Sequence, residues 1–240
     1  MITGILDSNQ KIVSNGLVLN LDAAQKRSYP GSGTTWTDLS GNAYNGTLTN
    51  GPTFSSSNGG SINFDGTNDY DTHGNVLAFE RTDPFSISAW FKVDSLSAGR
   101  PILSTQQATI LRGCLCQVNT SGSLRFAIIS TLNTNEIRIE TDISIINTGQ
   151  WYNLVATYDG SSDVSGMQQY VNGAIQSKNI ITNNLTSTTA TTASLIIGAR
   201  TVGTAGYYDG LISIVNIYNR ELSQDEITQN YNAIKSRFGL

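Results

Sequence analysis

The chain has 240 residues, of which 38% are hydrophobic and 13% charged, and its formal net charge is −4. The hydrophobic fraction is large enough for a packed core, so the low charge does not indicate disorder, and one all-β domain can use this whole length. The negative balance gives no electrostatic reason to bind nucleic acid. No apolar run reaches the roughly 18–20 residues that span a bilayer, so we expect no membrane insertion.

Residues 1–15 lack a clear hydrophobic period and are predicted to form a terminal arm ahead of a domain over 16–240. The first residues do not resemble a secretory signal, so we expect synthesis in a cytoplasm. An apolar arm would gain by covering the sheet edge of a neighbouring copy, which predicts a homo-oligomer. The alternative is an arm that folds along its own domain.

Alternation of apolar and polar residues predicts strands along most of the chain. Leu17, Leu19 and Leu21 form the first, and residues 28–60, rich in Gly, Ser, Thr and Asn, read as a long ordered loop. Cys114 and Cys116 are two apart on a predicted strand, where they share one face and serve as small apolar fillers.

The end of the chain predicts one helix over 223–238. Ser223 followed by Glu226 is the pattern of a capping box, and Leu222 can pack on Ile227 as a hydrophobic staple. Further apolar residues at helical spacing form a stripe. We expect this stripe to dock on the domain; the alternative is a contact with a neighbouring subunit.

Six segments carry a resemblance to a known family: SINFDGTNDYDT, FSISAWFKVD, WYNLVATYDG, QQYVNG, LIIGAR and YDGLISIVNIYNRELSQDEI. In sequence and spacing they resemble laminin G-like domains of the concanavalin A-like lectin/glucanase group. The resemblance implies an all-β fold, a two-sheet antiparallel jelly-roll sandwich with one short C-terminal helix. The residues expected to be largely buried are Phe64, Ile87, Trp90, Trp151, Leu154, Ala156, Tyr170, Ile197 and Ile214.

Catalysis is not expected. Glu136-Ile-Arg-Ile-Glu140 resembles the E-I-D-x-E signature of β-glucanases on this fold, but Arg138 replaces the middle acid. A cation between the glutamates opposes the protonated state that a general acid needs. We therefore interpret this segment as a solvated strand with cross-paired charges. His73 has no serine elbow near it and is interpreted as a surface-loop residue.

The resemblance also implies a candidate metal site. Related sandwiches often hold a structural calcium, and the positions that look similar here are Asp22, Asp38, Asn42 and Asp209. The alternative is that these side chains cap their own turns.

For a glycan, aromatic side chains with polar neighbours supply stacking and hydrogen bonds. The candidate glycan-binding residues are Tyr207, Arg200, Tyr44 and Trp36.

A narrower resemblance concerns residues 16–54 and 218–240, which are similar to laminin G-like domains in structural proteins of tailed bacteriophages. It implies a non-enzymatic virion protein, a head decoration or fibre or tail-associated protein on the virion surface, with other virion proteins as partners. The alternative is a carbohydrate-binding lectin module with a cell-surface glycan as its partner. Apart from the possible calcium, no cofactor is expected.

Overall fold

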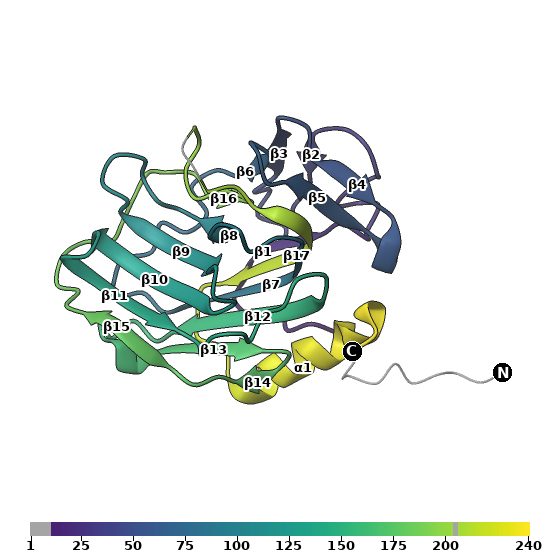
Figure 1. The fold of residues 1–240 in the computed structure, drawn as a ribbon. Helices are drawn as coiled ribbons and strands as arrows, with labels where there is room; N and C mark the ends of the chain where they lie inside the picture. Colours follow the sequence, from purple (N-terminus) through teal and green to yellow (C-terminus); the bar gives the residue numbers. More distant parts are fainter. Residues whose placement is uncertain (1–10, 204–205) are drawn as a thin grey trace.

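The computed structural model describes residues 11–203 and 206–240. Two antiparallel sheets pack face to face, and one short helix lies at the C-terminal end of the chain (Figure 1). The predicted all-β sandwich is therefore confirmed. Alternating side chains on each strand explain the arrangement, because one set of residues fills the space between the sheets and the other faces outward.

The first sheet has eight strands in the order β14-β13-β12-β7-β17-β5-β4, with β1 also pairing with β17. Its central strand β7 is hydrogen-bonded to both β12 and β17. The strands are β1 (Leu17–Asp22), β4 (Thr53–Ser55), β5 (Ser61–Asp65), β7 (Phe85–Val93), β12 (Trp151–Tyr158), β13 (Met167–Val171), β14 (Ala174–Ile175) and β17 (Asp209–Tyr218).

The second sheet has nine strands in the order β15-β11-β10-β9-β8-β16-β6-β3-β2. They are β2 (Thr35–Trp36), β3 (Gly46–Thr49), β6 (Tyr70–Thr72), β8 (Arg100–Ser104), β9 (Gly113–Val118), β10 (Leu124–Thr131), β11 (Asn135–Glu140), β15 (Asn179–Asn183) and β16 (Ile196–Ile197). Three short strands, β2, β3 and β4, fall within residues 28–60, so the prediction of one long loop there was wrong. Strands of two to four residues are too short to show an alternating pattern in the sequence.

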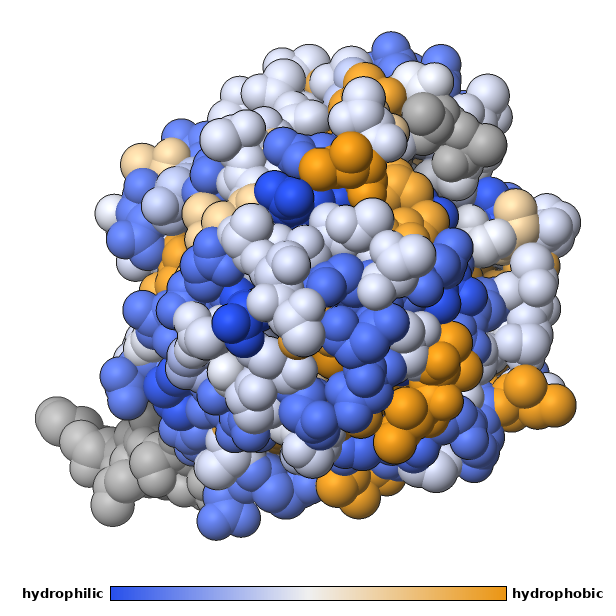
Figure 2. Space-filling model, turned by 90° about the vertical axis from the view of Figure 1, so that its left-hand side faces the viewer, coloured by the Kyte–Doolittle hydropathy of each residue, from blue (hydrophilic) through white to orange (hydrophobic). Residues whose placement is uncertain are grey.

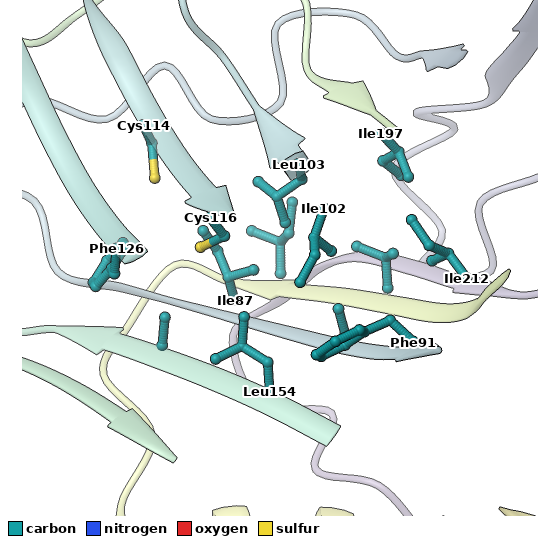
Figure 3. Packing of buried hydrophobic residues seen from close by; sticks show 14 of the residues in the cluster. Ile87, Phe91, Ile102, Leu103, Cys114, Cys116, Phe126, Leu154, Ile197 and Ile212 are labelled. Carbon is teal, nitrogen blue, oxygen red and sulfur yellow. The ribbon is translucent and has the colours of Figure 1, made fainter. Parts of the chain in front are cut away.

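The interior of the sandwich is filled from both sheets. Figure 3 shows Ile87, Phe91 and Leu154 of the eight-stranded sheet facing Leu103 and Phe126 of the nine-stranded sheet. The predicted core residues Phe64, Ala156 and Ile197 are also fully buried there. Both cysteines are free and point into this layer, as expected for small apolar fillers (Figure 3).

Four residues predicted for the core lie outside the space between the sheets. Trp90, Ile214 and Tyr170 are buried, but on the outward face of the eight-stranded sheet, and Trp151 is only partly buried there. The period of the strand explains this, because Ile87, Ala89 and Phe91 point inward and the residues between them must point outward. Their burial therefore depends on another element that covers the sheet from outside.

That element is the C-terminal segment. Helix α1 spans Gln224–Ile234, and a 3-10 turn, η4, continues it over Lys235–Phe238, so the predicted helix over 223–238 is α-helical only to residue 234. The capping box of Ser223 and Glu226 is present. Ile227 packs with Leu222, while Tyr231, Ile234 and Phe238 join Trp90, which confirms that the stripe docks on its own sandwich. Two further short 3-10 turns are η2 (Ser57–Gly59) and η3 (Val164–Gly166). None of the described helices is long and apolar enough to cross a membrane.

The predicted arm is described only from residue 11 onward; residues 1–10 lie outside the described part of the chain. The part that is described runs along α1 and β17 of its own domain. The backbone N–H of Val13 donates to Asn230 Oδ1 at 2.7 Å, and the Tyr218 hydroxyl donates to the Val13 carbonyl at 3.0 Å. Residues 11–15 therefore pack along their own sandwich, as in the alternative stated for the arm. Oligomer formation through the arm 1–15, of which residues 1–10 lie outside the described part of the chain, stays a prediction.

Candidate functional site

The outward face of the nine-stranded sheet carries a row of polar side chains across three strands. Gln117 of β9 and Glu140 of β11 both lie opposite Arg125 of β10. They point away from the core because their neighbours Cys116 and Phe126 point into it. Side chains directly opposite each other on adjacent strands are about 4.5–5.5 Å apart at Cβ, so these three form one continuous polar surface.

Two ion pairs organise this face. Arg125 Nε lies 2.8 Å from Glu140 Oε1, and Arg138 Nη2 lies 2.9 Å from Glu136 Oε1. The Glu136 side chain has no exposed area, whereas Arg125 and Glu140 keep about a quarter and a fifth of theirs. The expectation that both glutamates lie on a solvated strand was therefore wrong for Glu136.

Glu136 is buried because the centre of this face has an apolar floor. Leu115, Ala127 and Ile129 point outward from β9 and β10 yet are buried in a cluster with Leu132. Glu136 stands opposite Ile129 in the register. The Asn184 side chain accepts a hydrogen bond from the Glu136 backbone N–H at 2.9 Å, which closes the end of the face. A buried carboxylate needs a counter-charge, and Arg138 supplies it.

A depression of about 350 Å³ opens at one end of the same face. Gln117 Nε2 donates to Asn119 Oδ1 at 3.0 Å, and Asn119 Nδ2 donates to Ser123 Oγ at 2.9 Å, so the amides are held in fixed orientations. The depression is lined by Gly99, Gln117, Asn119, Thr120, Ser121, Arg125 and Glu140. Amides, hydroxyls, a guanidinium and a carboxylate together offer both donors and acceptors to a polar ligand.

Of the four predicted glycan residues, Arg200 is the one that reaches this face. Its Nε donates to Gln106 Oε1 at 2.7 Å. Burial lowers the pKa of the Arg200 guanidinium, the positive charges of Arg125 and Arg138 lower it further, and Glu136 raises it. These interactions place Arg200 within electrostatic reach of both ion pairs. Tyr207, another of the predicted glycan residues, lies in the same loop as Arg200, and its side chain is partly buried. Its hydroxyl accepts a hydrogen bond from the Gly203 N–H at 3.2 Å.

The other two predicted glycan residues do not join the site. Trp36 is fully buried in the core, so it is not a free aromatic side chain and that prediction was wrong. Tyr44 packs partly against the same core, and its carbonyl is hydrogen-bonded to the His73 ring. Both come from the stretch of short strands that the sequence presented as a loop, where the burial of an aromatic residue could not be foreseen.

His73 is buried and does not lie in a surface loop as expected. Its Nε2 is 2.7 Å from Asp71 Oδ2, its Nδ1 is 2.8 Å from the Tyr44 carbonyl, and only 2% of the residue is exposed. Gly46 lies against this pair, since a Cβ at that position would come within 2.5 Å of both side chains. Burial by itself lowers the pKa of His73, but the charge and hydrogen bond of Asp71 outweigh it, so the pKa is raised.

The four predicted calcium ligands each have another contact. Asp38 accepts hydrogen bonds from the N–H groups of Asn20, Ser40 and Tyr44, and Asn42 donates to the Val18 carbonyl. Asp22 pairs with Arg237 at 2.7 Å and Asp209 with Arg100 at 3.2 Å. Within residues 11–203 and 206–240, no group of three or more His, Cys, Asp or Glu side chains is placed to hold a metal ion. Asp38 therefore fits the alternative in which these side chains cap their own turns. A bound calcium stays a prediction.

A second, larger groove of about 590 Å³ lies on the opposite side of the sandwich, between α1, residues 11–12 and the outward face of β1 and β17. Asn20, Gln25 and Asn216 give it a polar lining, and Ile214 and Ile234 give it apolar patches. Asp22 is the one predicted site residue that borders it, and its carboxylate is already paired with Arg237.

The fold is that of a lectin-like sandwich. A family model described as the concanavalin A-like lectin/glucanases superfamily matches residues 65–228, and the chain belongs to this family. No sequence match was found among curated proteins. The family assignment confirms the resemblance to laminin G-like domains, while a phage origin is not shown by it.

Solved structures with a similar fold include toxin binding domains and sialidases. The binding domain of Paraclostridial Mosquitocidal Protein 1 has a TM-score of 0.69 and 17% identity, with 92% of this chain and 52% of that chain covered. The receptor binding domain of botulinum neurotoxin C/D mosaic serotype has a TM-score of 0.68, 16% identity and coverages of 91% and 51%. Trypanosoma rangeli sialidase in complex with sialic acid has a TM-score of 0.67, 16% identity and coverages of 92% and 33%. The chain thus spans about half of the toxin domains and a third of the sialidase, and at these identities the likeness concerns the fold.

Gln117, Asn119 and Arg125 were missed at the level of the sequence. A signal was present, because QVN and SLRF alternate polar and apolar residues on the two sides of a Ser-Gly turn. This pattern identifies a hairpin with one polar face. What it does not identify is which of the many polar strand faces of this chain is left uncovered.

Proposed function

We propose that the chain is a non-catalytic recognition domain that binds a glycan on the outward face of the nine-stranded sheet. The observation that carries this proposal is the 350 Å³ depression, in which amide, guanidinium and carboxylate groups from three adjacent strands converge. Sugar hydroxyls are both donors and acceptors, and a ligand of a few sugar units matches a site of this size and polarity.

The surface around the site favours a polar ligand over a large apolar partner. Figure 2, which views the side of the molecule where β10, β11 and β15 lie, shows a mainly hydrophilic surface with separate hydrophobic patches. Exposed isoleucines such as Ile143, Ile180 and Ile181 contribute single side chains to the surface of the molecule. Scattered apolar residues are normal for a protein surface and do not form the continuous patch that marks a large protein interface.

Two observations support binding without catalysis. Glu136, one of the two candidate carboxylates, is fully buried and held by Arg138, so a sugar cannot reach it. Glu140 is held in an ion pair by Arg125, with 2.8 Å between Nε and Oε1. A pair of carboxylates acting as acid and nucleophile needs both groups at the substrate. The toxin binding domains with this fold support a recognition role in the same way.

The proposal can be tested by glycan-array screening followed by calorimetry with the best-bound oligosaccharide. Gln117→Ala removes one amide from the depression and should weaken binding about tenfold, which corresponds to about 1.4 kcal/mol. Gln25→Ala is the matched control, because it removes the same amide from the larger groove on the other sheet. Loss of binding in the control and not in Gln117→Ala would assign the glycan to the other groove.

A virion role is a second candidate function. Residues 16–54 and 218–240, which carry the phage resemblance, lie side by side, since Arg237 pairs with Asp22 and the Asn219 N–H donates to the Gly16 carbonyl at 2.9 Å. The two resembling segments thus form one structural unit. In this role the domain would be displayed on the virion surface as an oligomer, bound to other virion proteins and presenting the glycan site outward.

Mass spectrometry of purified particles should then find the chain at a fixed copy number, and its absence from particles would remove this candidate while leaving glycan binding intact.

A structural calcium is proposed only for Asp22, Asp38, Asn42 and Asp209 together with backbone carbonyls. Chelation should lower the melting temperature if it is present; an unchanged melting temperature would remove the proposal.

A further inference from the structure

The charges on the outward face of the nine-stranded sheet do not balance. Arg125 is paired with Glu140 and Arg138 with Glu136, but Arg200 has no carboxylate within ion-pair distance among residues 11–203 and 206–240. Three guanidinium groups therefore face two carboxylates. This excess positive charge stands on a chain whose formal net charge is −4, so it is a local feature and does not follow from composition.

Arg200 is also held in a fixed orientation. Its Nε donates to Gln106 Oε1 at 2.7 Å. Gln106 is itself only 2% exposed, and its Nε2 donates to the Leu111 carbonyl at 2.9 Å, so the amide cannot turn away. With Nε engaged, the two terminal nitrogens of the guanidinium remain as donors for a further acceptor. A fixed donor pair of this kind matches the two oxygens of a carboxylate or a sulfate.

The electrostatic surroundings favour an anion at this point. Arg200 is partly buried and lies within reach of two positive charges, Arg125 and Arg138, and one negative charge, Glu136. An arginine stays charged under these conditions. Glu136 is one negative charge against two positive ones, so a bound anion would relieve the repulsion that remains. A neutral sugar would leave this charge uncompensated, whereas an acidic sugar would neutralise it in a partly desolvated setting, where charge interactions are stronger than in bulk water.

We propose that the glycan bound on this face carries an acidic group, a carboxylate or a sulfate, and that Arg200 binds this group through its terminal nitrogens. The inference rests on the proposed glycan-binding function and deepens it. In this arrangement the 350 Å³ depression next to Arg125 holds the sugar ring and its hydroxyls, and Arg200 selects for the charge. Arg200 is thus a specificity residue of the recognition site.

The test compares three tetrasaccharides by calorimetry: one of galacturonic acid, one of galactose, and one of sulfated galactose. The wild-type chain should bind at least one of the two acidic forms about tenfold more tightly than the neutral form, a difference that charge-assisted hydrogen bonds supply. Arg200→Gln should abolish this preference by weakening the binding of the acidic forms to about the level of the neutral form. Arg200→Lys should retain part of it, because the charge remains while the two-nitrogen geometry is lost. Which of the two acidic forms binds more tightly identifies the acidic group.

Arg27→Gln is the matched control, since it removes one positive charge from the opposite side of the molecule, at the larger groove. It should leave the preference intact, and equal loss in both variants would reduce the effect to net charge and overturn the inference. Equal binding of the neutral and acidic forms, insensitive to Arg200→Gln, would also overturn it while glycan binding itself stands. If no glycan on the array and none of the tetrasaccharides binds, the proposed function fails, and the inference fails with it.

Discussion

The two outward faces of the sandwich differ in whether another part of the chain covers them. On the eight-stranded sheet, Trp90 is stacked on Phe238 at 4.5 Å between ring centroids and on Tyr231 at 5.7 Å, so the C-terminal segment covers this face with aromatic side chains. On the nine-stranded sheet, Arg125 and Glu140 remain partly exposed beside a polar depression. One face is closed by the chain itself, and the other is open to a ligand.

The comparison shows what an outward-pointing apolar residue means in this fold. Strand β7 is buried along nearly its whole length, which is the pattern of a strand with packing on both sides. Strands β9 and β10 have a buried outward patch at Leu115 and Ala127. The polar row at Gln117 and Arg125 lies beside this patch, where β9 ends and β10 begins. The candidate site lies at the boundary between these buried apolar side chains and the neighbouring charged and amide side chains.

The largest expected effect comes from removing the cover of the closed face. Trp90→Ala should destabilise the fold by about 3–5 kcal/mol, because the buried ring contacts both Tyr231 and Phe238. Trp151→Ala should cost less, because Trp151 is only partly buried. Urea unfolding of both variants tests this order. If Trp151→Ala proves the more damaging of the two, the helix is not held mainly by the stack on Trp90.

On the open face, the two glutamates should differ. Glu136→Gln should destabilise the fold by about 3 kcal/mol, because it leaves the guanidinium of Arg138 without its buried partner. Glu140→Gln should cost about 1 kcal/mol or less, because its ion pair with Arg125 is partly exposed to water. Denaturant titrations of the two variants provide the comparison. Equal, small effects would mean that Glu136 is solvated after all.

The smallest effect concerns His73, a buried titratable group that belongs to neither outward face. Its pKa is raised in the folded state, against the lowering effect of burial, by Asp71, the Tyr44 carbonyl and the more distant charge of Asp38. The stabilisation is therefore complete below about 6.5, the usual histidine pKa, and is lost as the pH rises through the raised value. Unfolding measured from pH 6 to pH 9 should show this loss.

The variant His73→Gln removes the titrating group and serves as the reference for this measurement. Its stability should depend less on pH over the same range than that of the wild-type chain. A wild-type stability that increases with pH in this window would contradict a raised pKa. Asp71→Asn offers a second check, because it removes the charge that raises the pKa and should flatten the profile in the same way.

Much of the fold could be predicted where the pattern is local. The capping box of Ser223 and Glu226 places the start of the helix to the residue, because both hydrogen bonds lie within one turn. The long strands β7, β12 and β17 fall within the segments that carry the family resemblance. The short strands β2, β3 and β4 could not be found in this way, and with them the burial of Trp36 and His73 was missed.

The candidate site was predictable only in part for a related reason. Arg200 was identified at the level of the sequence, but its neighbours Arg125 and Arg138 come from other strands, and their distance in sequence gives no sign that they act on it. The four predicted calcium ligands had the right chemistry for a metal, yet the fold supplies Asp22, Asp38 and Asp209 with separate partners.

The sequence by itself determined the strand periods, the turns and the helix cap, because each depends on residues a few positions apart. The family, by contrast, came from the resemblance of six segments to laminin G-like domains, and the family model that matches residues 65–228 confirms it. Only the tertiary structure decided which outward face the C-terminal segment covers and that Glu136 is buried beside Arg138. It also decided that Arg200 has no carboxylate partner among the residues that the structure describes. The physical reason is that burial and charge balance depend on contacts between strands distant in the chain, and strand alternation is the same whether the outward side meets water, a helix or a ligand.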